Sequence, residues 1–228
     1  MTTASHLEAT RRFYEAIARR YDRVYCAYGR EARERLAWIA RALGGSARVL
    51  VLGVGTGREL PALLDAGHRP VGLDASRAML AVASRRARPV PLVEADLFAR
   101  LPFPDASFEA ALALHGTLAH APDEGALAAL SSELSRILVE GGRFVFEVPR
   151  PDWLEALHGA PGLPDADGRV TFREGKRFIT EDRVADARIE GQAFTEDTWR
   201  GAFGGAFGLT IEVKDGGVWL IWGIRRMR

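Results

Sequence analysis

Short apolar runs alternate with helix-like segments between residues 48 and 148, and this alternation narrows the folds open to the chain. Runs such as 48–52 (Arg-Val-Leu-Val-Leu) have no polar face, which is typical of strands buried on both sides in a parallel sheet. Because segments of helical periodicity separate these runs, the pattern predicts a doubly wound α/β sheet. The predicted strands are 48–52, 70–73, 90–94, 108–113 and 143–148, and the predicted helices are 58–66, 76–87 and 123–138.

Two further regions are predicted to lie outside this sheet. Apolar and aromatic residues at helical spacing over 7–21 and 33–43 predict two cap helices before the first strand. After the fifth strand, residues 151–194 begin with a Pro/Gly-rich stretch and continue with alternating runs at 169–172 and 177–180. These runs predict an inserted β-hairpin, which would serve as a lid or as a subunit interface.

The end of the chain is predicted to complete the sheet. A helix over 195–207, with Thr195 as its N-cap, precedes strands 209–214 and 217–224, which are joined tightly at Asp215-Gly216. The expected fold is therefore α/β, with a mostly parallel seven-stranded sheet in a single domain. Its expected parts are a helical cap (1–45), a core (46–150 and 195–228) and an insertion (151–194).

Composition excludes several classes of function. The 31 basic and 30 acidic side chains leave a net charge of +1, which gives no overall field for nucleic acid. No apolar stretch approaches the ~20 residues of a membrane span, so we expect a cytoplasmic protein without a membrane partner. A single cysteine, Cys26, forms no internal disulfide and supplies no cysteine-based zinc site, so no metal is expected.

A glycine-rich turn follows the first predicted strand and opens into a helix. Gly53, Gly55 and Gly57 allow a ligand to approach the backbone closely, and the helix N-terminus offers free N–H groups. Such a turn also serves NAD, FAD and purely structural roles. A dinucleotide fingerprint requires its third glycine at position 58, which is Arg58, so an NAD-dependent oxidoreductase is disfavoured.

Two acidic residues lie at the ends of the next two predicted strands. The carboxylate of Asp74 can accept hydrogen bonds from both hydroxyls of a ribose, and its alternative role is to cap the following helix. Asp96 can accept a hydrogen bond from an adenine amino group, and its alternative is a solvated loop carboxylate. The pair predicts an adenosine site.

Five segments, in order, resemble the motifs of S-adenosylmethionine (SAM) dependent methyltransferases of the Rossmann-like, seven-stranded, small-molecule type. The resemblance covers about residues 10–148 and is much more specific than a glycine turn alone. One position departs from the family pattern, because Val51 replaces the acid that usually helps to hold the methionine end of SAM. The segments are 53–57, 71–76 with Met79 and Leu80, 94–97, 101–109 and 138–143.

The resemblance implies a SAM cofactor and a position for each of its parts. The methionine part would lie on the turn, the ribose on Asp74, and the adenine between apolar side chains and an acidic edge. Tyr21, in a Tyr-Asp segment similar to one that closes over SAM in the family, would contact the methionine carboxylate or simply pack. The implied contacts are Gly53, Val54 and Gly55 for methionine, Ala75 and Met79 for the adenine faces, Asp96 and Leu97 for its edge, and Leu114 near the methyl group.

A candidate general base follows the fourth predicted strand. His115 lies where the methyl group is expected, although a histidine in this loop also commonly packs; His120, His158 and Glu147 are weaker candidates. We expect methyl transfer to a nitrogen or oxygen of a small molecule, with a non-catalytic binding module as the competing class. A homodimer is compatible with the insertion. Residues expected to line an acceptor pocket are Trp153, Leu154, Leu157, Phe172 and Phe178.

Overall fold

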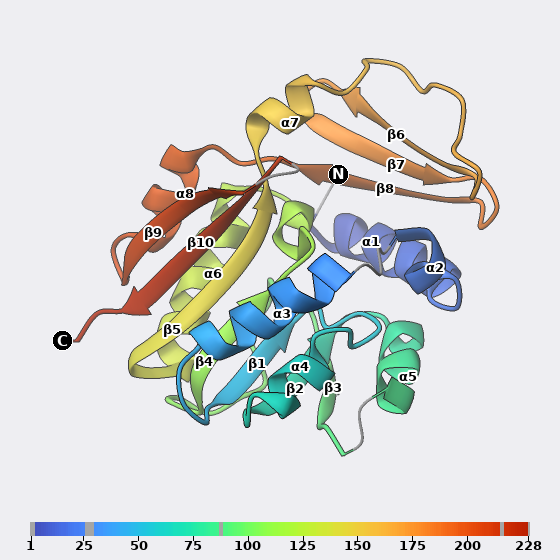
Figure 1. The fold of residues 1–228 in the computed structure, drawn as a ribbon. Helices are drawn as coiled ribbons and strands as arrows, with labels where there is room; N and C mark the ends of the chain where they lie inside the picture. Colours follow the sequence, from blue (N-terminus) through green and yellow to red (C-terminus); the bar gives the residue numbers. More distant parts are fainter. Residues whose placement is uncertain (1–2, 26–29, 87–88, 215–216, 228) are drawn as a thin grey trace.

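The computed structural model describes residues 3–25, 30–86, 89–214 and 217–227 (Figure 1). Cys26 and the predicted turn at Asp215-Gly216 lie outside the described residues. Within these ranges, no helix is long and apolar enough to cross a membrane.

Seven strands form the central sheet, in the order β3-β2-β1-β4-β5-β10-β9. The pairings are parallel from β3 to β5, and β10 is antiparallel to both of its neighbours. The prediction of a mostly parallel, seven-stranded α/β sheet is therefore confirmed. The strands are β1 (Arg48–Leu52), β2 (Arg69–Asp74), β3 (Leu92–Glu94), β4 (Phe108–Ala113), β5 (Leu138–Pro149), β9 (Phe207–Lys214) and β10 (Val218–Arg225).

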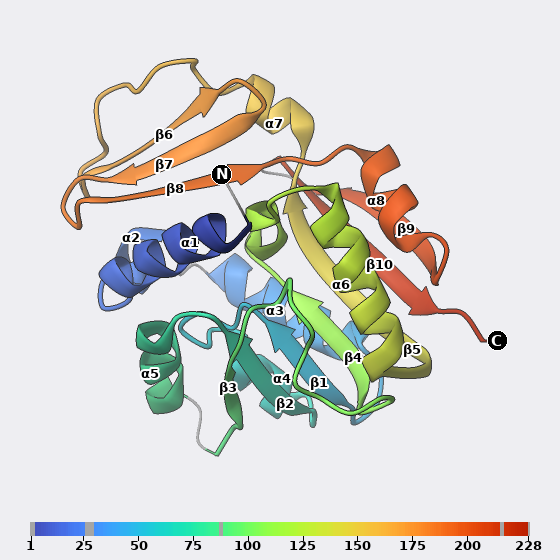
Figure 2. The ribbon, with the colours of Figure 1, turned by 180° about the vertical axis from the view of Figure 1, so that it is seen from behind.

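Helices cover both faces of this sheet, as the alternation of side chains in β1 requires. Val49 and Val51 point to one face and pack with α3 and α4, whereas Leu50 and Leu52 point to the other and pack with α6 and α8 (Figures 1 and 2). Because all four side chains are at most 2% exposed, β1 is the centre of the core. The helices are α3 (Arg30–Ala42), α4 (Leu60–Asp65), α5 (Arg77–Arg86), α6 (Glu124–Ile137) and α8 (Glu196–Phe203).

Several helix boundaries differ from the predicted ones. The helix expected over 58–66 begins only at Leu60, because residues 54–59 form the turn that follows β1. The helix expected over 195–207 ends at Phe203, and Phe207 already begins β9. Its predicted N-cap is confirmed, since the Thr195 side chain accepts a hydrogen bond from the Thr198 amide.

The insertion contains a separate three-stranded antiparallel sheet where a hairpin was predicted. β6 (Arg169–Glu174) and β7 (Arg177–Asp182) form the predicted hairpin, and β8 (Ala187–Gln192) adds a third strand beside β7. A short helix, α7 (Pro151–Glu155), connects this sheet to β5. The small sheet lies above the carboxyl ends of the central strands (Figure 1).

The amino-terminal region is divided differently from the predicted two-helix cap. The segment expected as one helix over 7–21 forms α1 (Thr3–Ile17) and α2 (Tyr21–Tyr25), with a turn between them. α1 packs against β8 and α5 through a cluster that includes Phe13, Ile17 and Ile189. α3 covers a face of the central sheet, so of the three amino-terminal helices α1 and α2 lie over the carboxyl ends of its strands (Figure 2).

Candidate active site

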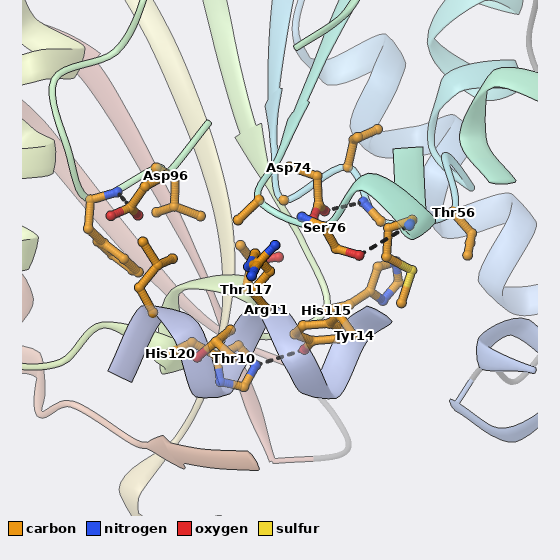
Figure 3. A pocket seen from close by; sticks show the side chains of 18 of the residues that line it. Thr10, Arg11, Tyr14, Thr56, Asp74, Ser76, Asp96, His115, Thr117 and His120 are labelled. Carbon is orange, nitrogen blue, oxygen red and sulfur yellow. Dashed lines mark hydrogen bonds between the residues drawn. The ribbon is translucent and has the colours of Figure 1, made fainter. Parts of the chain in front are cut away.

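A cavity lies at the carboxyl ends of β1, β2 and β4, where the strand order reverses between β1 and β4. Open α/β sheets bind ligands at this position. α1 forms the opposite wall with Thr10, Arg11 and Tyr14 (Figure 3). This first cavity is lined by every residue predicted to contact the cofactor, namely Tyr21, Gly53, Val54, Gly55, Asp74, Ala75, Met79, Asp96, Leu97 and Leu114, and by His115.

The glycine turn forms the edge of the first cavity nearest β1. Gly53 and Gly55 have φ angles of +61° and +51°, which side chains rarely adopt. A Cβ atom on Gly53 would lie 2.4 Å from Thr117 Cγ2, so any side chain at this position would also clash with Thr117. Val51, which replaces the usual acid, is buried in the apolar layer under α3 and α4. The Gly55 amide instead donates to Asp74 Oδ2 over 2.8 Å.

Asp74 ends β2 and is held by two backbone amides. Besides Gly55, the amide of Ser76 donates to its Oδ1 over 2.8 Å. Burial raises the pKa of this carboxyl to about 6, although the backbone donors act in the opposite direction. The Ser76 hydroxyl accepts the Met79 amide and so caps α5.

Asp96 lies further along the first cavity, after β3. Its Oδ1 accepts the Phe98 amide over 2.9 Å, which fixes the carboxylate at the turn (Figure 3). Leu97 and Phe98 add apolar surface beside it. The two acids therefore border one cavity, with an apolar surface between them to which Met79 also contributes.

His115 lies between two buried carboxylates. Its Nε2 is 3.1 Å from Glu59 Oε1, and its Nδ1 is 3.9 Å from Glu147 Oε1. His115 has a φ of +57°, so the loop after β4 holds a left-handed backbone that side chains seldom adopt. Burial disfavours the charge of Glu59, yet contact with His115 lowers the pKa of this carboxyl below its usual value.

His120 has a different environment and holds three elements together. The main-chain carbonyl of Glu190 in β8 can only accept, so His120 Nδ1 carries the proton of their 3.0 Å hydrogen bond. Its Nε2 then accepts the Tyr14 hydroxyl over 2.8 Å, which joins α1 to the short helix η1 (Thr117–His120). Burial lowers the pKa of His120 to about 4, so this ring is neutral and poorly suited as a base near pH 7.

A second cavity lies next to the first and is bounded by α1, α2, β5, α7 and the small sheet. Four residues line both cavities, among them His115 and Tyr14. Of the residues expected to line an acceptor pocket, Trp153 and Phe178 do so, whereas Leu154, Leu157 and Phe172 do not. Phe172 is buried within the small sheet, and Leu154 is buried in α7. His158 borders neither cavity, whereas Glu147 lines the second.

Sequence reasoning missed the contribution of α1 to the first cavity. His6, Thr10 and Tyr14 follow one another at four-residue intervals and therefore share one face of the helix. That spacing is a signal in the sequence, although it lies beside the more prominent apolar stripe of Phe13 and Ile17. Glu59 and Thr117 were also missed, since nothing in their local sequence distinguishes them from helix-start residues, whereas Thr56 lies within the turn predicted to hold the methionine part. Among the described residues, no group of three or more His, Cys, Asp or Glu could hold a metal ion.

Comparisons with known proteins agree with this geometry. Residues 50–146 match the family described as methyltransferase domain. A demethylmenaquinone methyltransferase of Beutenbergia cavernae is 37% identical over 153 residues, which are 64% of this chain and 61% of the relative. The chain spans 50 to 65% of the length of the curated relatives it matches. Residues 50–146 therefore carry a methyltransferase domain, as the sequence motifs predicted.

Solved structures share the fold over most of the chain. A sugar N-methyltransferase from Streptoalloteichus superposes with a TM-score of 0.65 at 23% identity, covering 86% of this chain and 87% of its own. A SAM-bound amino pentose methyltransferase from Micromonospora echinaspora gives a TM-score of 0.64 at 23% identity, covering 86% and 90%. At such low identity, these two likenesses establish a common fold.

Proposed function

We propose that this chain, whose residues 50–146 carry a methyltransferase domain, transfers a methyl group from SAM to a nitrogen or oxygen of a small molecule. The observation that carries the proposal is the first cavity, where Asp74, Asp96 and apolar side chains border one space beside a second cavity for an acceptor. The curated and structural relatives named above include methyltransferases of small molecules, which supports the same class of acceptor. A cytoplasmic location and a homodimer remain predictions.

The residues of the first cavity fit SAM. Asp74 offers carboxylate oxygens to the two ribose hydroxyls, and Asp96 offers one to the adenine amino group. Met79 and Leu97 supply apolar surfaces for the adenine faces. At Gly55 an added Cβ atom would have no neighbour closer than 4.0 Å, so the missing side chain leaves the backbone there open to the methionine part.

The chain's own contribution to the reaction is mainly positioning. When bound, SAM supplies a methyl group attached to a positively charged sulfur. A nucleophile in line with the carbon–sulfur bond takes the methyl group, and the neutral sulfur leaves. The two cavities meet at His115 and Tyr14, so an acceptor in the second cavity would approach the cofactor there. Holding both reactants in line and excluding water can account for up to about 7–11 kcal/mol of the barrier.

His115 is the residue best placed to take a proton from the acceptor. The 3.1 Å approach of Nε2 to Glu59 favours a proton on Nε2, because a bare lone pair would be repelled by the carboxylate. Nδ1 then carries the lone pair and lies on the side of Glu147. His120, whose pKa is lowered to about 4, is a poor alternative.

Binding of S-adenosylhomocysteine (SAH), the spent cofactor, tests the proposal. We expect titration calorimetry to detect SAH binding, and the melting temperature to rise with SAH concentration, because a ligand that binds only the native state stabilises it. NADH is the control and should produce neither effect. If NADH binds and SAH does not at millimolar concentration, the methyltransferase proposal fails; if SAH binds but no methyl transfer occurs across a metabolite library, the chain is a non-catalytic binding module.

A further inference from the structure

We propose that Glu59 binds the α-ammonium group of the methionine part of SAM through its carboxylate oxygen Oε2. This inference rests on the proposed function and adds a third recognition group to the first cavity. It depends on the order of the acids along the sheet, on the burial of the Glu59 carboxylate, and on the hydrogen-bond donors that SAM offers.

Three carboxylates of the described residues line the first cavity, and they follow the order of the strands. Asp96 comes after β3, Asp74 ends β2, and Glu59 ends the turn that follows β1. These strands are neighbours in the order β3-β2-β1. Figure 3 shows Asp96, Asp74 and Thr56, which belongs to this turn, in the same order across the cavity. Adenine, ribose and methionine also follow one another in SAM, so adenine at Asp96 and ribose at Asp74 direct the methionine part toward Glu59.

The buried carboxylate of Glu59 has one oxygen that the described protein leaves unsatisfied. Glu59 is 6% exposed, and its Oε1 lies 3.1 Å from His115 Nε2. Its Oε2 is also buried, and it accepts no hydrogen bond from the described residues. Burial opposes the charge, but His115 and Arg58 hold the pKa of this carboxyl below its usual value, so Glu59 is ionised near pH 7. A buried, charged oxygen without a donor is costly, and a ligand that supplies a donor removes part of that cost.

Helix capping does not account for this carboxylate. Glu59 is the N-cap residue of α4, but its side chain makes no capping hydrogen bond. Its main-chain carbonyl accepts the Leu63 amide over 3.1 Å, which anchors the residue in the helix while its side chain lies at the first cavity. An acid is favoured at the start of a helix, yet an exposed carboxylate would meet that preference equally well.

The donors of SAM leave one group for Glu59. Under the proposed function, the two ribose hydroxyls are bound by Asp74 and the adenine amino group by Asp96. The sulfonium is positively charged, but it has no N–H or O–H group to donate. The α-ammonium has three N–H donors and lies at the methionine end, so it can give Oε2 a charge-assisted hydrogen bond, the stronger kind.

Three ligands that differ by one group each test this inference on the intact chain. SAH carries the α-ammonium, deamino-SAH has a hydrogen atom in its place, and SAM adds the sulfonium. We expect titration calorimetry to show that SAH binds about 10- to 100-fold more tightly than deamino-SAH, as hydrogen bonds to charged groups predict. Glu59→Gln keeps the shape of the side chain without its charge. It should reduce this ratio to a few-fold and leave the ratio of SAM to SAH affinity unchanged.

A matched variant controls for the loss of one negative charge. Asp65→Asn removes a charge at the exposed end of α4 and should leave the ratio of SAH to deamino-SAH affinity intact. If Glu59→Gln folds poorly, as judged by its melting temperature, Glu59→Asp supplies a second test. It keeps the charge but shortens the side chain by one methylene group, and it should also lower the ratio.

The outcomes separate this inference from the proposed function. Equal affinities of the parent chain for SAH and deamino-SAH would overturn the inference. The same ratio in the parent and in Glu59→Gln, or an equal loss in Asp65→Asn, would overturn it as well. A loss confined to the preference for SAM over SAH would place Glu59 at the sulfonium and would also contradict it. If the parent chain binds neither SAH nor SAM, the proposed function fails instead.

Discussion

Lowering the pH from 7 to 5 is expected to weaken SAH binding through Asp74. Because burial raises the pKa of this carboxyl to about 6, it is mostly ionised at pH 7 and mostly protonated at pH 5. A protonated carboxyl has lost the charge that strengthens its hydrogen bonds to the ribose hydroxyls. If only the ionised form binds well, the apparent Kd rises about tenfold at one pH unit below the pKa.

The same protonation should stabilise the ligand-free fold. The folded pKa of about 6 is higher than the ordinary value of 3.8, so the folded chain binds this proton more tightly than the unfolded chain does. The resulting stabilisation is complete below pH 3.8 and is lost as the pH rises through about 6. Between pH 7 and pH 5, Asp74 alone should therefore add roughly 1 kcal/mol to the free energy of unfolding.

Two measurements on two proteins test this opposition of binding and stability. SAH calorimetry and urea denaturation are carried out at pH 7, 6 and 5 on the parent chain and on Asp74→Asn, which does not titrate. The difference between the two proteins isolates Asp74 from other groups that change charge in this range. If both proteins show the same pH dependence of Kd and of unfolding free energy, burial does not control Asp74 in the way we infer.

Two other substitutions test the site and the turn. His115→Asn tolerates the left-handed backbone and should lower kcat about 100- to 10,000-fold with little change in SAH affinity. His158→Ala lies outside both cavities and should change neither kcat nor SAH affinity. Equal losses of kcat in the two variants would show that His115 takes no part in the chemistry. Gly57→Ala adds a Cβ atom 2.9 Å from Leu60 Cδ1 at a φ of +75° and should cost more unfolding free energy than Gly67→Ala, which has a φ of +83° but open space. Urea denaturation should give about 1–2 kcal/mol for Gly67→Ala, and equal costs for the two variants would show that the close contact at Gly57 is unimportant.

The centre of the sheet could be predicted because β1, β2 and β4 are buried over most of their length. Residues 49–52 contain only Val and Leu, and no solvent-exposed position interrupts the pattern. β8 lacks such a signal, because Ile189 is its only large apolar residue. The break between α1 and α2 was missed for a different reason. Arg20, in that turn, forms an ion pair with Asp182 over 2.8 Å, and this tertiary contact is invisible to local helix propensity.

The part of the site formed by strand ends could be predicted from the topology of the sheet. Asp74 and Asp96 follow neighbouring parallel strands, whose carboxyl ends necessarily lie at one edge of the sheet. Tyr14 could not be placed in this way, because the position of α1 depends on contacts with β8 and on the hydrogen bond to His120. The approach of Glu59 to His115 likewise depends on a left-handed backbone at His115 that its local sequence does not signal.

Trp153 and Phe178, which line the second cavity, pack on Gly217 and Gly191, and this packing has a consequence for how the cavity evolves. A side chain can appear at Gly191 only if Phe178 becomes smaller, because an added Cβ atom would overlap its ring, and at Gly217 an added Cβ atom would meet both Trp153 Cβ and its ring at a φ of +76°. Each ring and its glycine should therefore be inherited as a pair. A lineage that acquires a different acceptor through this wall must change both partners or neither, and an isolated substitution at Gly191 or Gly217 would be selected against before it could be compensated.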